Sequence, residues 1–101
     1  MEEEATTLNA ANGQIACRLH ARDLNLVMGP AAPGTSLQFR VRIDGHPPGE
    51  AHGTDTDTDG NGNLSQQRVY QLIRHPGPIS ERTFEIIFPD PGAQAYCFTF
   101  G

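Results

Sequence analysis

The strongest pattern in this sequence is the strict alternation of apolar and polar residues over positions 37–44, which read Leu-Gln-Phe-Arg-Val-Arg-Ile-Asp. Successive side chains of a β-strand point to opposite faces, so this alternation predicts a strand with one face on a core and one face in water. Antiparallel sheets commonly have one solvated face of this kind. The same period of two recurs over 14–20, 24–28, 83–88 and 95–100.

Glycine and proline separate these segments and keep each of them short. The 101 residues include 11 Gly and 8 Pro, and most of the prolines lie in the turn segments 29–34, 45–49, 75–78 and 89–92. Residues 64–74 are the one stretch with a plausible helical spacing, but Val69, Tyr70 and Ile73 also suit a strand, which we favour. We therefore predict one all-β domain over residues 1–101, with about six to eight short antiparallel strands in a sandwich or barrel. A final hairpin is expected around 89–92, and residues 1–5 are expected to be loose.

Charge and hydropathy exclude several classes of function. The formal net charge is −5 and the pI is about 5.1, which disfavours non-specific binding to nucleic acid or to an anionic membrane. No apolar run approaches the roughly 20 residues of a membrane-spanning helix, and the acidic start Met-Glu-Glu-Glu lacks the features of a secretory signal. No recognisable nucleophile–base pair or phosphate-binding loop is present, so we expect no catalysis by this chain.

Residues 55–63 read Asp-Thr-Asp-Thr-Asp-Gly-Asn-Gly-Asn and concentrate carboxylates with turn formers. Carboxylates at positions one, three and five followed by glycine at six match the start of an EF-hand calcium loop. The candidate calcium ligands are Asp55, Asp57, Asp59, Asn61 and Asn63. Position twelve is Gln66 instead of glutamate, so any calcium binding is expected to be weak. The alternative is a solvent-exposed hairpin tip, because Asp-Gly and Asn-Gly favour turns.

A second candidate site combines the polar positions of two predicted strands. If 14–20 and 37–44 lie in one sheet, four potential cations line one surface: Arg18, His20, Arg40 and Arg42. Planar guanidinium groups suit directed hydrogen bonds, so this surface is a candidate for docking a protein or binding a glycan, with Tyr70 as a further contact. The alternative is an ordinary solvated surface that Glu81 and Glu85 neutralise.

The two cysteines, Cys17 and Cys97, lack the spacing of a redox Cys-x-x-Cys pair and are too few for a structural zinc site. Both lie in strand-like segments, so we expect two buried free thiols. A disulfide between the first and last strands is the alternative.

Several segments resemble a known family in their amino-acid sequence. Residues 19–30 read LHARDLNLVMGP, residues 39–45 read FRVRIDG, and PPG follows at 47–49. Residues 68–74 read RVYQLIR, residues 83–86 read TFEI, and residues 95–100 read AYCFTF. Over roughly residues 8–101 the chain resembles the carboxy-terminal domain of DipZ-type proteins, which are bacterial thioredoxin-family proteins linked to cytochrome c biogenesis.

The resemblance implies a jelly-roll-like β-sandwich similar to carbohydrate-binding modules, a periplasmic setting and a thioredoxin-like domain in the same parent chain. It carries over no catalytic residue and no redox centre. We therefore expect a monomeric, non-catalytic accessory domain that docks the thioredoxin-like domain of its parent chain or a client protein. A carbohydrate-binding module and a calcium-stabilised structural module are the alternatives, and calcium is the one candidate cofactor.

Overall fold

The computed structural model describes residues 6–8, 13–32, 34–77 and 81–100, so the expectation for residues 1–5 lies outside it. The described residues form eight strands and one short 3-10 helix. The first four strands are β1 (Thr6–Leu8), β2 (Gly13–Leu19), β3 (Asp23–Pro30) and β4 (Leu37–Ile43). The 3-10 helix η1 (Gly49–Ala51) follows, and then β5 (Asn61–Leu64), β6 (Arg68–Arg74), β7 (Arg82–Phe88) and β8 (Ala93–Phe100).

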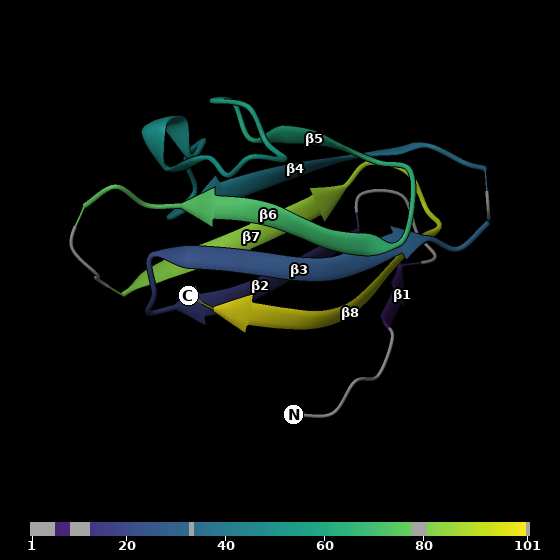
Figure 1. Ribbon diagram of the computed structural model, residues 1–101, viewed down its shortest axis with the longest axis horizontal. Coiled ribbons are helices and arrows are strands. Elements are labelled where there is room, and N and C mark those ends of the chain that lie inside the picture. The colour runs from purple at the N-terminus through teal and green to yellow at the C-terminus, as the bar shows by residue number, and fades with distance from the viewer. Residues whose placement is uncertain (1–5, 9–12, 33, 78–80, 101) are drawn as a thin grey trace.

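The strands form two antiparallel sheets packed face to face (Figure 1). One sheet has the order β1-β8-β3-β6 and the other has the order β2-β7-β4-β5. Every paired neighbour runs antiparallel. The predicted all-β antiparallel sandwich is confirmed. No helix among the described residues has the length and apolar character needed to cross a membrane.

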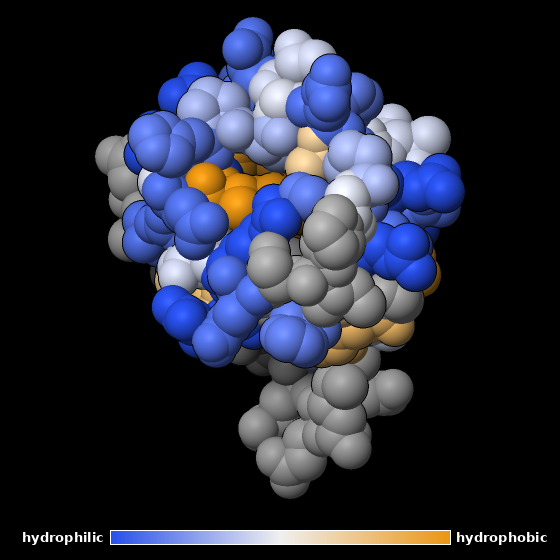
Figure 2. Space-filling model, turned by 90° about the vertical axis from the view of Figure 1, so that its left-hand side faces the viewer, coloured by the Kyte–Doolittle hydropathy of each residue, from blue (hydrophilic) through white to orange (hydrophobic). Residues whose placement is uncertain are grey.

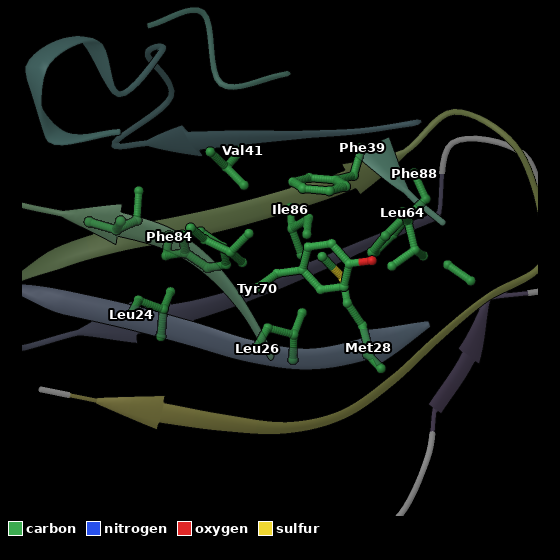
Figure 3. Packing of buried hydrophobic residues seen from close by; sticks show 14 of the residues in the cluster. Leu24, Leu26, Met28, Phe39, Val41, Leu64, Tyr70, Phe84, Ile86 and Phe88 are labelled. Carbon is green, nitrogen blue, oxygen red and sulfur yellow. The ribbon is translucent and has the colours of Figure 1, made fainter. Parts of the chain in front are cut away.

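The core lies between the sheets and uses every second residue of the central strands. On β4 the apolar positions of the alternating segment are buried while the polar positions point outward. Tyr70 is fully buried near the centre, and the edge of its ring meets Phe39 at a centroid distance of 6.0 Å (Figure 3). Phe84 meets Phe98 in the same edge-on way at 6.1 Å. Burying one such side chain contributes about 1.5–3 kcal/mol.

The segment predicted as one strand over 64–74 is divided into the end of β5 and the whole of β6, with a turn at 65–67. The buried hydroxyl of Tyr70 holds this turn, because it donates to the carbonyl of Gln66 at 2.7 Å and accepts from the N–H groups of Ser65 and Gln66 at 3.3 Å. The chain therefore leaves one sheet at Leu64 and enters the other at Arg68. Alternation alone gives no sign of such a crossing.

The predicted final hairpin is wrong. β7 and β8 belong to different sheets, so the turn at 89–92 crosses the sandwich instead of joining paired strands. The carbonyl of Gly92 accepts from the N–H of Ala31, which ties this crossing to the turn after β3. Strand β1 was not among the segments predicted as strands, and η1 was not predicted; its first residue, Gly49, lies in the segment predicted as a loop.

The outer edge of β6 is covered by residues 52–55. The N–H of Gly53 donates to the carbonyl of Leu72 at 2.9 Å, and the N–H of Asp55 donates to the carbonyl of Gln71 at 3.1 Å. A β-carbon on Gly53 would lie 2.1 Å from that Gln71 carbonyl oxygen, so only glycine allows this close approach. This segment extends the sheet by a few bonds without being a regular strand.

Candidate functional site

The outer surface of the β2-β7-β4-β5 sheet carries Arg18, Arg40 and Arg42, and we call it the arginine face. Arg40 and Arg42 occupy alternate positions of β4 and therefore project on the same side. β2 and β4 are not direct neighbours, because β7 lies between them and places Glu85 opposite Arg42 and Thr83 opposite Arg18. His20 is exposed and lies just beyond the end of β2.

Arg18 is partly neutralised by a neighbouring carboxylate. Its guanidinium lies 3.0 Å from Glu81 and also donates to the hydroxyl of Thr83 at 3.3 Å. The hydrogen bond and charge of Arg18 lower the pKa of the Glu81 carboxyl. Both side chains are more than half exposed, so this surface pair contributes little to stability. Glu85 instead accepts a hydrogen bond from the side-chain amide of Gln14 at 3.2 Å.

Arg40 and Arg42 make no ion pair within the described part of the chain. The Nε of Arg40 donates to the side-chain oxygen of Asn61 on the neighbouring strand β5 at 3.0 Å. Two hollows meet at this Arg40–Asn61 contact. The first, which we call the Arg40–Arg42 hollow, has a volume of about 450 Å³ and is lined by Arg40, Arg42, Gly45, Pro47, Asp59 and Asn61. The second, of about 340 Å³, extends past Gln38, Asp57 and Asn63.

Tyr70 does not belong to the arginine face. Its side chain is fully buried, and β6 lies in the opposite sheet. The prediction that it contacts a partner or glycan there is wrong, because its ring serves the core and its hydroxyl is used by the turn at 65–67.

Asp55 is held by two residues of β6, Arg68 and Gln71. Its carboxylate lies 2.8 Å from Nη2 and 3.3 Å from Nη1 of Arg68, and it accepts the N–H of Gln71 at 2.7 Å. Burial alone would raise the pKa of this carboxyl, but the hydrogen bonds from Arg68 and Gln71 and the charge of Arg68 outweigh it, so the pKa is lowered. The hydrogen bond that Arg68 donates to Asp55 raises the pKa of Arg68 in turn.

Asp57 organises the turn that leads into β5. One carboxylate oxygen accepts the N–H groups of Asp59 at 3.0 Å and Asn61 at 2.9 Å. Gly60 has a φ of +88°, a conformation that favours glycine, and its N–H donates to the carbonyl of Asp57 at 2.9 Å. The loop is therefore shaped by its own hydrogen bonds, as expected for a tight turn before a strand.

The predicted calcium ligands do not converge in this arrangement. Within the described residues, no three Asp, Glu, His or Cys side chains are placed to hold one metal ion. Asp55 is turned toward Arg68 and Asp57 toward backbone N–H groups, whereas Asp59 and Asn63 are exposed. Coordination by all five candidates would require Asp55 to leave its ion pair.

A further hollow of about 510 Å³ lies at the end of the sandwich where β4 and β6 end (Figure 2). Buried Ile43 and Ala51 are among its apolar lining residues, and His46, Glu50 and His75 are among the polar ones. Figure 2 shows apolar atoms in a depression ringed by polar residues at this end. Its histidines, His46 and His75, lie in separate proline-containing loops, so no spacing in the sequence indicates this hollow.

Cys17 is a free, half-buried thiol on β2, opposite Phe84. Burial raises the pKa of this thiol, which keeps it protonated and weakly nucleophilic. The backbone of Cys97 lies in β8 opposite Val27, in the other sheet. The side chain of Cys97 lies outside what the structure describes, so its predicted burial is not tested.

The comparison with protein families covers the chain from end to end. Residues 1–101 match the family described as the thioredoxin like C-terminal domain. The chain belongs to this family. The resemblance found in the sequence, to the C-terminal domain of thioredoxin-family proteins, is thereby confirmed at the level of the domain. No curated protein matches this thioredoxin-like C-terminal domain.

Several solved structures share the fold of this thioredoxin-like C-terminal domain. A family two carbohydrate esterase from Clostridium thermocellum in complex with cellohexaose has a TM-score of 0.67 at 9% identity, covering 94% of this chain and 26% of that chain. The family two carbohydrate esterase from Cellvibrio japonicus has a TM-score of 0.64 at 19% identity, covering 93% of this chain and 25% of that chain. The domain thus spans about a quarter of these esterases.

The carbohydrate-binding module CBM36 in complex with calcium and xylotriose is similar over nearly its whole length. Its TM-score is 0.57 at 9% identity, covering 97% of this chain and 88% of that chain. At such identities the likeness shows the fold alone. It confirms the predicted likeness of the thioredoxin-like C-terminal domain to carbohydrate-binding modules and their jelly-roll architecture.

Proposed function

We propose that this is a non-catalytic binding domain of an extracytoplasmic thioredoxin-family protein, and that its arginine face docks the thioredoxin-like domain of the parent chain or a client of that domain. The observation that carries the proposal is the pair Arg40 and Arg42. Both project from one sheet surface of an acidic protein, and neither forms an ion pair with a described residue. Membership of the family supports the thioredoxin-like parent. The proposed compartment follows from the resemblance found in the sequence, and the monomeric state is part of the proposal.

Electrostatic docking fits this surface for a physical reason. Guanidinium groups are weakly hydrated and bind carboxylates in a planar, two-point geometry, so they lose less on desolvation than lysine would. A partner with an acidic patch would therefore form favourable ion pairs with Arg40 and Arg42. Most of the remaining surface would repel it, because the protein is acidic overall. This combination would fix the orientation of the partner.

The test is a heteronuclear NMR titration of this chain with a purified thioredoxin-like domain. We expect saturable shifts on β4 and β5, and weaker binding in each of the single variants Arg40→Gln and Arg42→Gln. The matched control is Arg74→Gln, which removes an exposed arginine from β6 in the opposite sheet. Equal weakening by the control would show that net charge alone drives binding and would contradict docking through the arginine face.

Glycan binding is the second candidate. It is supported by the fold likeness to carbohydrate-binding modules and by the two adjoining hollows on the arginine face. The polar linings of these hollows, with side-chain amides and carboxylates beside arginine, offer donors and acceptors for hydroxyl groups. Glycans and the thioredoxin-like domain can be titrated against the same NMR spectrum, so one set of measurements compares both ligands.

A further inference from the structure

The Arg40–Arg42 hollow has a cationic side and a hydrogen-bonding side, and this division specifies a ligand more narrowly than the face as a whole. Arg40 and Arg42 supply two guanidinium groups from β4. Asn61 at the start of β5 supplies an amide, and Asp59 in the turn before it supplies a carboxylate. At about 450 Å³ the hollow falls within the range of small-molecule sites, which is about 300–1,000 Å³.

From this arrangement we propose that the hollow binds a sugar ring that bears a carboxylate, a uronic acid residue of a polysaccharide. The inference rests on the proposed binding function of the arginine face and names a ligand class for one part of it. The carboxylate of the sugar lies against Arg42 and Arg40, and the ring hydroxyls face Asp59 and Asn61.

The two arginines are available for a ligand carboxylate. Neither guanidinium is paired with a carboxylate of the described residues, and the one side-chain hydrogen bond of Arg40 uses only its Nε. The terminal nitrogens of Arg40 are therefore left for the two-point bonds that carboxylates accept. Glu85, the cross-strand neighbour of Arg42, accepts from Gln14 and does not line the hollow.

The hydroxyl-binding side is also open. The backbone N–H of Asp59 is used by Asp57, but its exposed carboxylate accepts no hydrogen bond from the described residues. Asn61 accepts from Arg40 through its oxygen, which leaves its amide N–H groups as donors. Pro47 adds an apolar edge against which the C–H groups of a sugar ring can pack.

The same residues argue against a strongly anionic ligand. Asp59 lines this hollow and Asp57 lines the adjoining one, in a chain of net charge −5. A phosphate or a peptide with several carboxylates would bring further negative charge close to these groups and be repelled. A single carboxylate on a ring of hydroxyls satisfies both sides at once.

The test uses the methyl glycoside of galacturonic acid, a single ring with one carboxylate, and its methyl ester, each titrated into this chain and followed by heteronuclear NMR. The two probes share the same ring and hydroxyls, and differ in the charge of the carboxyl group. We expect saturable shifts at Arg40, Arg42, Asp59 and Asn61 with the acid, and at least tenfold weaker binding of the ester. Raising the salt concentration should weaken binding of the acid and leave that of the ester unchanged.

Substitutions provide a second measurement. Arg42→Gln and Arg40→Gln should each weaken binding of the acid at least fivefold, with circular dichroism confirming that both variants fold. Arg74→Gln is the matched control, since Arg74 is exposed on β6 in the opposite sheet and does not line the hollow. It should leave the affinity unchanged.

The outcomes separate this inference from the proposed function. Equal binding of acid and ester would overturn the carboxylate preference, while glycan binding by the arginine face would stand. Binding of the thioredoxin-like domain with no response to either sugar probe would overturn the inference and leave the docking function intact. If no probe shifts the arginine face, both fail.

Discussion

The guanidinium of Arg68 lies 3.8 Å from the centroid of the Tyr70 ring. In this position Arg68 also forms its two-point ion pair with Asp55. Three features meet here: the aromatic centre of the core, the start of the acidic loop and the edge of β6. A residue of the candidate calcium loop therefore has a structural role in this fold.

The first prediction concerns the stability that this ion pair provides. Asp55→Asn and Arg68→Met should each lower the free energy of unfolding by about 1–2 kcal/mol. Hydrogen bonds to charged groups contribute about 1.5–3 kcal/mol, and the partial exposure of Arg68 reduces that value. Urea unfolding of the two single variants and the double variant measures the coupling energy between Asp55 and Arg68. If the effects of the two substitutions were additive, the ion pair would make no contribution to stability. Arg18→Met, which breaks a more exposed pair, should leave stability almost unchanged.

The second prediction concerns pH. The pKa of Asp55 is lowered in the folded protein, so its contribution to stability is present above the unfolded pKa of about 3.9 and is lost as pH falls through the folded pKa. The difference in unfolding free energy between the wild type and Asp55→Asn should be constant from about pH 7 to pH 5 and shrink below about pH 4. If the difference in unfolding free energy stayed constant down to about pH 2, the stability that Asp55 contributes would not depend on its ionisation, and the prediction would be wrong.

The third prediction concerns calcium. With Asp55 held by Arg68, a calcium ion would have to use the remaining candidates of the acidic loop. We expect the melting temperature to rise only at millimolar calcium, by an amount that corresponds to about 1.4 kcal/mol at ten times Kd. Asp59→Asn should abolish the rise, whereas Asp55→Asn should preserve it. No rise at 10 mM calcium, or an equal rise in Asp59→Asn, would reject calcium binding by this loop.

The fourth prediction concerns Cys17. Because burial raises the pKa of this thiol, iodoacetamide at pH 7.5 should alkylate it much more slowly in the folded chain than in urea. Mass spectrometry of peptides reports Cys17 separately from Cys97. Rapid alkylation in the folded chain would contradict the raised pKa of this thiol. Reduction of insulin disulfides that Cys17→Ser abolishes would contradict a non-catalytic accessory role.

Local alternation was sufficient to predict most of the strands and much of the core. The segment around Phe39 and Val41 lies as expected, because burial on one face dictates both the strand and its orientation. The sequence did not reveal which sheet each strand joins. The turns after Leu64 and Phe88 both cross the sandwich, and their residues would suit a hairpin equally well.

The residues of the candidate sites could be named from the sequence, but the residues that they contact could not. Arg40 and Arg42 share a face because they are two positions apart on one strand, which the sequence reports directly. Tyr70 was assigned to that face by residue type, yet its position on β6 places it in the core. The Asp55–Arg68 contact joins residues thirteen apart, with strand β5 and the turns on either side of it between them, so no spacing rule identifies it.

Residues 52–55, which cover the outer edge of β6, have a consequence for self-association of the protein. An uncovered edge strand exposes a row of N–H and C=O groups to which another chain can add. The N–H groups of Gly53 and Asp55 bond to carbonyls of this row from within the same molecule. A substitution that lifts this segment would thus free the edge for strand exchange between copies, and self-association would follow before the core itself unfolds.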